Sequence, residues 1–177
     1  DFGAHTAAAG DVNKDGFDDI IVGAINHRVE GSSVGALKVY SGKDGSLLYK
    51  KTGSQFLSYY GRNVSGMGDI NNDGYDDFAA SVLSHKVDNL NVGLIEVFSG
   101  KTGDLIHRFQ GSETRLRLGD TFANAGDINN DGYPDIIASS YHADLYKDGS
   151  VILFSGLDGS ELNINLEPSL PDYEVEF

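Results

Sequence analysis

The sequence predicts an all-β chain made of three repeated four-stranded units. Short motifs recur every 58 residues through almost the whole length of 177 residues. Each interval holds apolar runs of strand length separated by glycine-containing turns, and no stretch shows the 3.6-residue period of an amphipathic helix. A fixed period of this size indicates a repeat architecture, in which every interval folds into the same small unit.

Each unit is predicted to begin with a strand of small residues. These strands cover residues 5–10, 63–68 and 121–126, and each ends in glycine before a shared aspartate. Ala7, Ser65 and Ala123 are examples of their side chains. Such residues suit inner strands that crowd around a common axis, where a leucine would not fit.

A nine-residue loop follows each first strand and predicts a Ca²⁺ site. The loops cover residues 11–19, 69–77 and 127–135, with oxygen side chains at positions one, three, five and nine and glycine at position six. The main-chain carbonyl of position seven supplies a further oxygen, as suits a hard cation that takes six to eight oxygens. The predicted ligands are Asp11, Asn13, Asp15, Phe17 and Asp19 in the first loop, Asp69, Asn71, Asp73, Tyr75 and Asp77 in the second, and Asp127, Asn129, Asp131, Tyr133 and Asp135 in the third.

Two other interpretations of these loops compete with a calcium site. An EF-hand needs glutamate at position twelve and flanking helices, whereas Val22, Ala80 and Ala138 stand there between predicted strands. The other interpretation is a surface turn of Asp, Asn and Gly without metal. Three copies with all four oxygen positions intact favour calcium, and Pro134 replaces an aspartate only at a position that is not a predicted ligand.

The rest of each unit supplies three more strands. Second strands are predicted at residues 19–24, 77–82 and 135–140, and third strands at 36–40, 94–98 and 150–154. Hairpin turns with two glycines follow at 42–45, 100–103 and 156–159. The fourth strand is clearest at 162–166, where apolar and polar residues alternate. The predicted units are therefore residues 1–58, 59–116 and 117–166, and 167–177 form a tail that is either a linker or an added edge strand.

Four short strands per repeat are typical of a β-propeller blade. Propellers close with four to eight blades, whereas this chain holds three, so we expect a partial propeller. Either the chain is part of a longer protein, or copies associate to complete a ring or a stack. Because the chain opens directly on Asp1-Phe2-Gly3, we expect a processed or excised piece.

Composition excludes several classes of function. The formal net charge of −14 argues against nucleic-acid binding, which needs clusters of Lys and Arg. No apolar run reaches the roughly 20 residues of a membrane-spanning helix, so we expect no membrane insertion. The absence of cysteine excludes disulfides and thiolate chemistry. Weak calcium sites are useful where Ca²⁺ is abundant, which predicts an extracellular or cell-surface location.

The order of motifs in the first unit resembles the FG-GAP repeat of integrin α-subunits. Phe2-Gly3 is followed by Gly-Asp-Val-Asn-Lys-Asp-Gly-Phe-Asp-Asp-Ile-Ile-Val-Gly-Ala at residues 10–24. The second and third units depart from it, with Tyr60-Gly61 and Leu118-Gly119 in place of Phe-Gly. The resemblance covers residues 1–166 and implies a calcium-binding β-propeller of the FG-GAP, integrin α-like family. It also implies that partners bind on the face opposite the calcium loops.

Candidate ligand-binding residues lie in the loops predicted for that opposite face. They are aromatic, arginine and histidine side chains, of kinds that often anchor a partner. The candidates are Tyr59, Tyr60, Arg115, Arg117, Tyr141 and His142. The competing interpretation is that the tyrosines pack between blades and the arginines are solvated.

These features predict a calcium-stabilised module for adhesion or recognition of an extracellular protein or glycan. We identify no catalytic residues, because no pairing of nucleophile and base stands out in the sequence. Two alternatives stay open. One is a structural unit that self-associates into rings or filaments through its open blade edges, and the other is a non-catalytic part of an enzyme that acts on polysaccharides.

Overall fold

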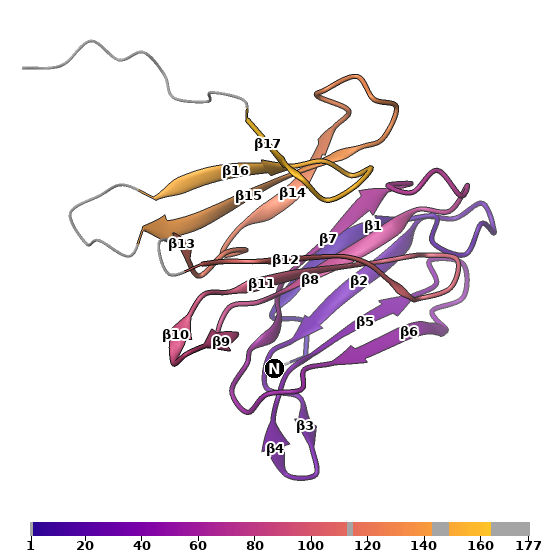
Figure 1. Cartoon of the computed structure of the whole chain (residues 1–177). Coiled ribbons are helices and arrows are strands. Elements are labelled where there is room, and N and C mark those ends of the chain that lie inside the picture. The colour runs from indigo at the N-terminus through magenta and orange to yellow at the C-terminus, as the bar shows by residue number, and fades with distance from the viewer. Residues whose placement is uncertain (1, 113–114, 143–148, 164–177) are drawn as a thin grey trace, which may run out of the picture.

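The computed structural model describes residues 2–112, 115–142 and 149–163, which form antiparallel sheets and no helix (Figure 1). The predicted tail, 167–177, and most of the predicted strand 162–166 lie outside the described residues. No helix in the described part of the chain is long and apolar enough to cross a bilayer. The all-β prediction is therefore confirmed.

Three sheets follow one another along the chain, each with its strands in sequence order from the inner to the outer edge. The first contains β1 (His5–Gly10), β2 (Asp19–Ala24), β5 (Ala36–Tyr40) and β6 (Leu47–Thr52). The second contains β7 (Tyr60–Gly68), β8 (Asp77–Val82), β11 (Leu94–Phe98) and β12 (Leu105–Gln110). The third contains β14 (Phe122–Gly126), β15 (Asp135–His142), β16 (Ser150–Phe154) and β17 (Glu161–Leu162).

Strand register repeats from sheet to sheet. Ala7 pairs with Ile21 and Ile21 with Val39 in the first sheet, and the equivalent residues pair in the other two. In the third sheet Ser140 pairs with Ser150, ten residues along the chain, whereas the equivalent Ala24 and Ala36 are twelve apart, so the third repeat is two residues shorter between these positions. The same register follows from the same pattern of inward and outward side chains, because a slip of one residue would reverse every side chain.

Short strands add to this plan where the sequence predicted loops. The connection between the second and third strands folds into a hairpin twice, as β3 (Arg28–Val29) with β4 (Ser32–Ser33) and β9 (Lys86–Val87) with β10 (Leu90–Asn91). A further strand, β13 (Arg115–Leu116), pairs with β15 of the third sheet. Positive φ at Glu30, Gly31, Asp88 and Asn89 turns the two hairpins, as tight two-residue connections require.

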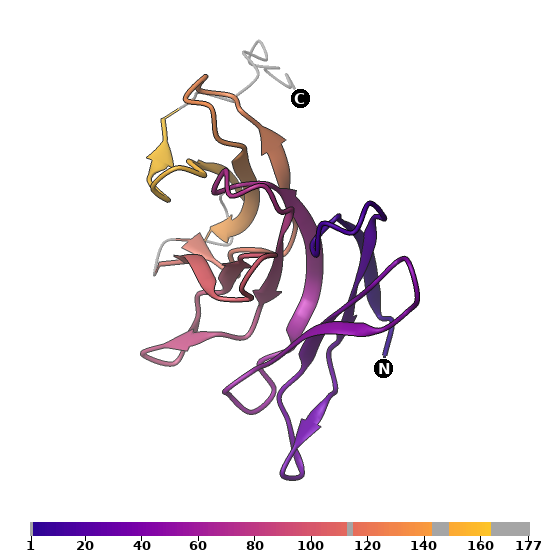
Figure 2. The ribbon, with the colours of Figure 1, turned by 90° about the vertical axis from the view of Figure 1, so that its right-hand side faces the viewer.

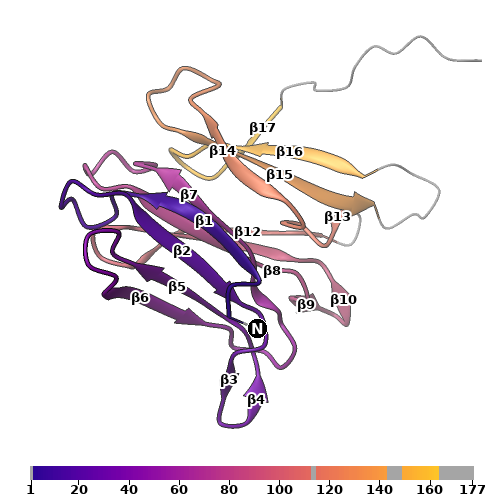
Figure 3. The ribbon, with the colours of Figure 1, turned by 180° about the vertical axis from the view of Figure 1, so that it is seen from behind.

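The sheets fan around their first strands, since β7 packs against both β1 and β14 (Figures 1 and 3). Figure 2 shows the indigo first sheet and the orange third sheet on opposite sides of β7. Equivalent bridges join neighbours, Gly35 to Tyr60 and Gly93 to Leu118. The blades of a β-propeller are arranged in this way, with the first strand of each sheet nearest a common axis. The structure thus confirms a partial propeller of three blades.

Two apolar clusters fill the spaces between the sheets. Strand β8 serves both, because Phe78 and Ala80 join the cluster with the first sheet and Ala79 joins the cluster with the third. Every residue of β8 is buried. On the two outermost faces, by contrast, Ile20 and Val151 are 48% and 55% exposed. The middle blade is therefore covered on both faces, while the first and third blades each leave one face open.

Candidate metal loops and an arginine-lined pocket

The three predicted metal loops share one hydrogen-bond pattern. In the second loop, Asp73 N donates to Asp69 Oδ1 at 2.8 Å and to Asn71 Oδ1 at 3.0 Å. Gly74 N donates to Asp69 Oδ2 at 2.7 Å, and Tyr75 N donates to Asp73 Oδ1 at 3.1 Å. The same four bonds occur in the first and third loops at 2.9–3.1 Å. Positions one, three and five are thus turned toward the inside of the loop.

The aspartate at position nine ties each loop to the hairpin turn of the same blade. Asp77 is fully buried, and its Oδ2 accepts Ile70 N at 2.9 Å while its Oδ1 accepts Gly100 N at 2.8 Å. Asp19 and Asp135 are equally buried and bridge the equivalent pairs, Val12 with Gly42 and Ile128 with Gly156. This carboxylate therefore has a structural role in every blade.

Backbone conformation explains two residue choices in the loops. The sixth position has φ near 90° in all three, as Gly16, Gly74 and Gly132 show. The fourth position is also left-handed, with φ of 60° at Lys14, 56° at Asn72 and 59° at Asn130. Asparagine adopts this conformation more readily than other non-glycine residues, so the loop geometry favours Asn at position four.

The donor chemistry of the loops suits Ca²⁺. Burial raises the pKa of Asp77 to about 7, and the carboxylates of Asp73 and Asp69 also raise it, whereas two backbone N–H bonds oppose the shift. Among the described residues no group of three Asp, Glu or His side chains is placed to hold a metal ion. The carboxylates of Asp69 and Asp73 accept backbone N–H groups of their own loop. An ionised carboxylate has about four acceptor sites, so these bonds leave lone pairs for a cation.

Neighbouring loops also contact one another at this end of the sheets. Asp11 N donates to Asp76 Oδ2 of the next blade at 2.8 Å, and Asn72 Nδ2 donates to Gly132 O at 3.0 Å. From the fourth strands, Tyr49 Oη donates to Gly100 O at 2.6 Å, and His107 Nε2 lies 2.7 Å from Gly156 O. The loops and turns therefore form a continuous layer that joins blade to blade.

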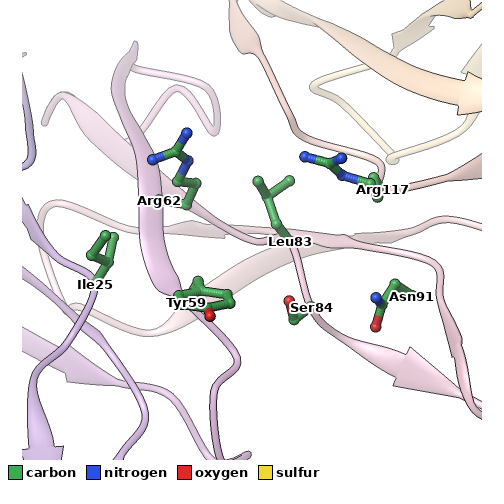
Figure 4. A pocket seen from close by; sticks show the side chains of 7 residues that line it. All are labelled: Ile25, Tyr59, Arg62, Leu83, Ser84, Asn91 and Arg117. Atoms are coloured by element: carbon green, nitrogen blue, oxygen red, sulfur yellow. The ribbon is translucent and has the colours of Figure 1, made fainter.

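A pocket of about 390 Å³ opens at the opposite end of the sheets, where the second strands end and β7 begins (Figure 4). Its lining comes from all three repeats and contains two arginines but no acidic residue. The lining residues are Ile25, Tyr59, Arg62, Leu83, Ser84, Asn91 and Arg117. In Figure 4 the guanidinium groups of Arg62 and Arg117 lie on the same side of the pocket, with Leu83 between them.

The two arginines differ in their partners. Arg117 forms an ion pair with Asp120 at 3.2 Å. Within the described parts of the chain, the Arg62 guanidinium forms no hydrogen bond or ion pair. Burial lowers the pKa of His5, and the positive charge of Arg62 lowers it further. The pocket therefore contains a cationic group whose charge no described carboxylate neutralises.

The structure separates the predicted ligand-binding residues. Tyr59 and Arg117 line the pocket. Tyr60 does not, since it is 3% exposed and belongs to the core between the first two sheets. It lies in the wall of a second cavity of about 220 Å³, where its hydroxyl bonds Glu96, which also pairs with Arg108. In the backbone, Arg115 of β13 pairs with His142 of β15, and Tyr141 lies beside His142 in β15. The structure describes the backbone of these three residues but not their side chains.

The sequence interpretation missed Arg62, Leu83, Ser84, Asn91 and Ile25. Arg62 had a usable signal, because the equivalent positions in the other repeats hold Ala4 and Asp120. A residue that departs from its repeat in both charge and size indicates a local role. The remaining residues gave no comparable signal, since Leu, Ser and Asn are ordinary at the ends of strands.

Comparison with known proteins agrees with the repeat geometry. The FG-GAP repeat matches residues 2–40 and 119–154. Integrin alpha-V of Gallus gallus is 29% identical over 159 residues, which are 86% of this chain and 15% of that protein. Integrin alpha-4 of Xenopus laevis is 30% identical over 154 residues, which are 81% of this chain and 14% of that protein. The chain belongs to the FG-GAP, integrin α-like family.

The middle blade, 59–116, lies outside the matched FG-GAP ranges but shares the register and loop bonds of its neighbours. Solved structures also resemble this FG-GAP chain. An exotype rhamnogalacturonan lyase and a rhamnogalacturonan lyase of Bacillus licheniformis each superpose with a TM-score of 0.55 at 15% identity. Each superposition covers 91% of this chain and 32% or 33% of the lyase. At this identity the likeness concerns the fold. The chain spans about one-seventh of the length of the two integrin relatives and a third of the lyases.

Proposed function

We propose that this chain is the calcium-stabilised part of an extracellular β-propeller that recognises a protein or glycan without catalysing a reaction. The observation that carries this proposal is the division of the blades into two ends. One end holds three loops that share one hydrogen-bond pattern and the same oxygen side-chain positions, and the other holds an arginine-lined pocket built by all three repeats. Stabilisation and recognition would thus occupy separate surfaces.

The residues that would hold Ca²⁺ are positions one, three, five and nine and the position-seven carbonyl of each loop. Ca²⁺ would supply positive charge beside carboxylates that are buried or crowded by like charges, as at Asp77. The aspartate at position nine would then connect the ion to the hairpin turn through its backbone bonds. We expect each site to stiffen the connection between the first and second strands of its blade.

Calorimetric titration with Ca²⁺ tests this half of the proposal. Three ions per chain are expected, with dissociation constants in the range of about 10⁻⁴ to 10⁻³ M typical of extracellular modules. The variant Asp73→Ala should bind two, whereas Asp104→Ala, which changes an exposed turn residue, should still bind three. Absence of binding by the unmodified chain would contradict the proposal.

The recognition half is tested by binding to arrays of extracellular proteins and glycans, with Ca²⁺ and with chelator. The relatives named integrin α-subunits support an extracellular or cell-surface location and partners of this kind. We expect at least one saturable interaction that weakens after Arg62→Gln. If binding occurs only at the loop end, so that pocket variants leave it unchanged, recognition would have to be placed elsewhere.

The structural likeness to two rhamnogalacturonan lyases favours a second candidate, a catalytic part of an enzyme that cleaves polysaccharides. Incubation with rhamnogalacturonan and measurement of ultraviolet absorbance by unsaturated products distinguishes the two. The recognition proposal predicts no product. Product formation would favour the enzyme.

The exposed faces of the first and third sheets favour a third candidate, self-association. Apolar residues such as Ile20 and Val151 lie exposed there, at the faces where further blades of a propeller would pack. Native mass in Ca²⁺ tests this candidate. A discrete dimer or a much larger species would support it, whereas a monomer would exclude it.

A further inference from the structure

We infer that the pocket between the blades binds the carboxylate of an acidic sugar. This inference rests on the proposed recognition function and specifies the ligand class. It begins with charge, because the chain carries 27 acidic residues against 13 Lys and Arg. Two of those 13 cations nevertheless line one small pocket that has no acidic lining residue. Because Asp120 pairs with Arg117, the charge of Arg62 makes this pocket a local positive site on an otherwise negative molecule.

Geometry favours a carboxylate as the group that Arg62 receives. A guanidinium has five donors arranged as a planar fork, which matches the two oxygens of a carboxylate. Arg62 forms no ion pair with any described residue, so its fork has no carboxylate partner within the described chain. Asp120 orients Arg117 beside the same pocket, so that a second cation flanks the bound group.

The other lining residues fit a sugar ring. The ring of Tyr59, which is 36% exposed, and the side chains of Leu83 and Ile25 present apolar surface to the C–H groups of a sugar. Ser84 and Asn91 are neutral and both donate and accept hydrogen bonds, as hydroxyl groups require. Apolar walls with a few convergent polar groups are typical of small-ligand sites.

Pocket size distinguishes a sugar from a protein segment. Small-ligand sites range from about 300 to 1,000 Å³, and this pocket of about 390 Å³ lies at the lower end. Stable protein partners instead cover roughly 800 Å² of each surface. The pocket therefore suits one or two sugar units better than a protein epitope.

The backbone holds two lining residues in an uncommon conformation. Tyr59 and Arg117 occupy equivalent positions in consecutive repeats, with left-handed φ of 52° and 54°. The backbones of Tyr60 and Leu118, which follow these two residues, lie close to Gly35 and Gly93. A Cβ added to Gly35 would lie 2.4 Å from Tyr60 O, and one added to Gly93 would lie 2.3 Å from Leu118 N. Left-handed non-glycine residues persist where the surrounding structure imposes them, often at ligand sites.

Nuclear magnetic resonance titration of the full chain tests the inference with pairs of sugars that differ only in the carboxylate. Glucuronate is compared with glucose and galacturonate with galactose. We expect the uronates to shift the amide signals of Tyr59, Leu83 and Ser84 and to bind at least tenfold more tightly than the neutral sugars. Arg62→Gln should weaken uronate binding about tenfold, and Arg62→Lys should recover only part of the loss because a lysine cannot form the fork.

Arg28→Gln provides the matched control, since it removes the same charge from the exposed strand β3 outside the pocket. Equal binding of acidic and neutral sugars would overturn the carboxylate assignment while recognition itself stands. Binding of an aspartate-rich peptide but of no uronate would show that the pocket binds an acidic protein segment and not a sugar. If the extracellular arrays yield a ligand and no uronate binds, only this inference fails. If neither yields binding, the recognition proposal fails with it.

Discussion

Asp77 Oδ1 accepts the backbone N–H of Gly100 at 2.8 Å, across 23 residues of sequence. The equivalent bond joins Asp19 to Gly42 and Asp135 to Gly156. Each bond is buried or partly buried, and each fixes a candidate metal loop against the turn between the third and fourth strands. The position-nine aspartate therefore has a function that does not depend on metal, beside its proposed role as a ligand.

Asp77→Ala should lower the free energy of unfolding even in excess chelator. The change leaves Ile70 N and Gly100 N unpaired in a buried place, at a cost of about 1–3 kcal/mol each. Urea unfolding in chelator measures the loss without a metal contribution. The exposed Asp104→Ala should stay within about 0.5 kcal/mol of the unmodified chain. Equal midpoints for the two variants would contradict the structural role.

Removal of Ca²⁺ should lower the melting temperature. A ligand at 100 times its dissociation constant stabilises the folded state by about 2.7 kcal/mol per site. Melting curves in about 10 mM Ca²⁺ would reach this ratio for a dissociation constant of about 10⁻⁴ M. The variant Asp131→Ala should show a smaller difference between Ca²⁺ and chelator. Identical curves in both conditions for the unmodified chain would be incompatible with calcium sites.

Gly100→Ala should destabilise the second blade and its contact with the first. Its added Cβ would lie 1.9 Å from Asp76 O and 3.0 Å from Val12 O, so backbone must move. Overpacking of this kind costs about 1–3 kcal/mol, and we expect the upper end. Gly45→Ala is the control, because a Cβ at Gly45 meets open space and only its left-handed φ of 75° costs about 1–2 kcal/mol. Chemical denaturation compares the two, and a larger loss for Gly45→Ala would contradict the packing.

Phe78→Ala should be among the most destabilising single changes. The ring is fully buried and stacks on Tyr49 of the first sheet at 5.4 Å and on Phe98 of its own sheet at 5.7 Å. Truncation of such a ring costs about 3–5 kcal/mol. Phe56, which is 69% exposed, provides the comparison, and Phe56→Ala should have little effect in thermal or urea unfolding. If Phe78→Ala lowers the free energy of unfolding less than Phe56→Ala does, the blades do not pack through this aromatic stack.

Arg62→Gln should raise the pKa of His5. Burial is the first cause of its lowered pKa, and the Arg62 charge is the second because it opposes protonation of the ring. The pKa of His5 in the folded chain lies below its ordinary value of 6.5, so the folded state loses stability relative to the unfolded state as the pH falls through about 6.5. Arg62→Gln should make this loss of stability smaller. Resonance titration of the imidazole measures the shift. Arg28→Gln should leave it unchanged, and an equal response to both variants would remove Arg62 from the neighbourhood of His5.

The sequence alone determined the main strands of the three sheets and the candidate metal loops, but not the short strands β3, β4, β9, β10 and β13. Regular repetition made this feasible, since each prediction could be compared at three positions. The bounds predicted for β1, β2, β5, β8, β11 and β16 agree with the structure, whereas β7 starts three residues earlier than predicted and β15 ends two residues later. Alternation of inward and outward side chains is a local property, so the chain reveals it without knowledge of the fold.

Tertiary structure alone decided which side chains meet between the blades. Arg62 and Arg117 are 55 residues apart, so the 58-residue period does not relate them, and the angle of the fan brings them to one pocket. The same angle buries Tyr60, a predicted ligand-binding residue, and exposes Tyr59 beside it. Repetition specifies each blade, but the pocket depends on how blades stack, and that is set by the packing of the cores around Phe78 and Ile136.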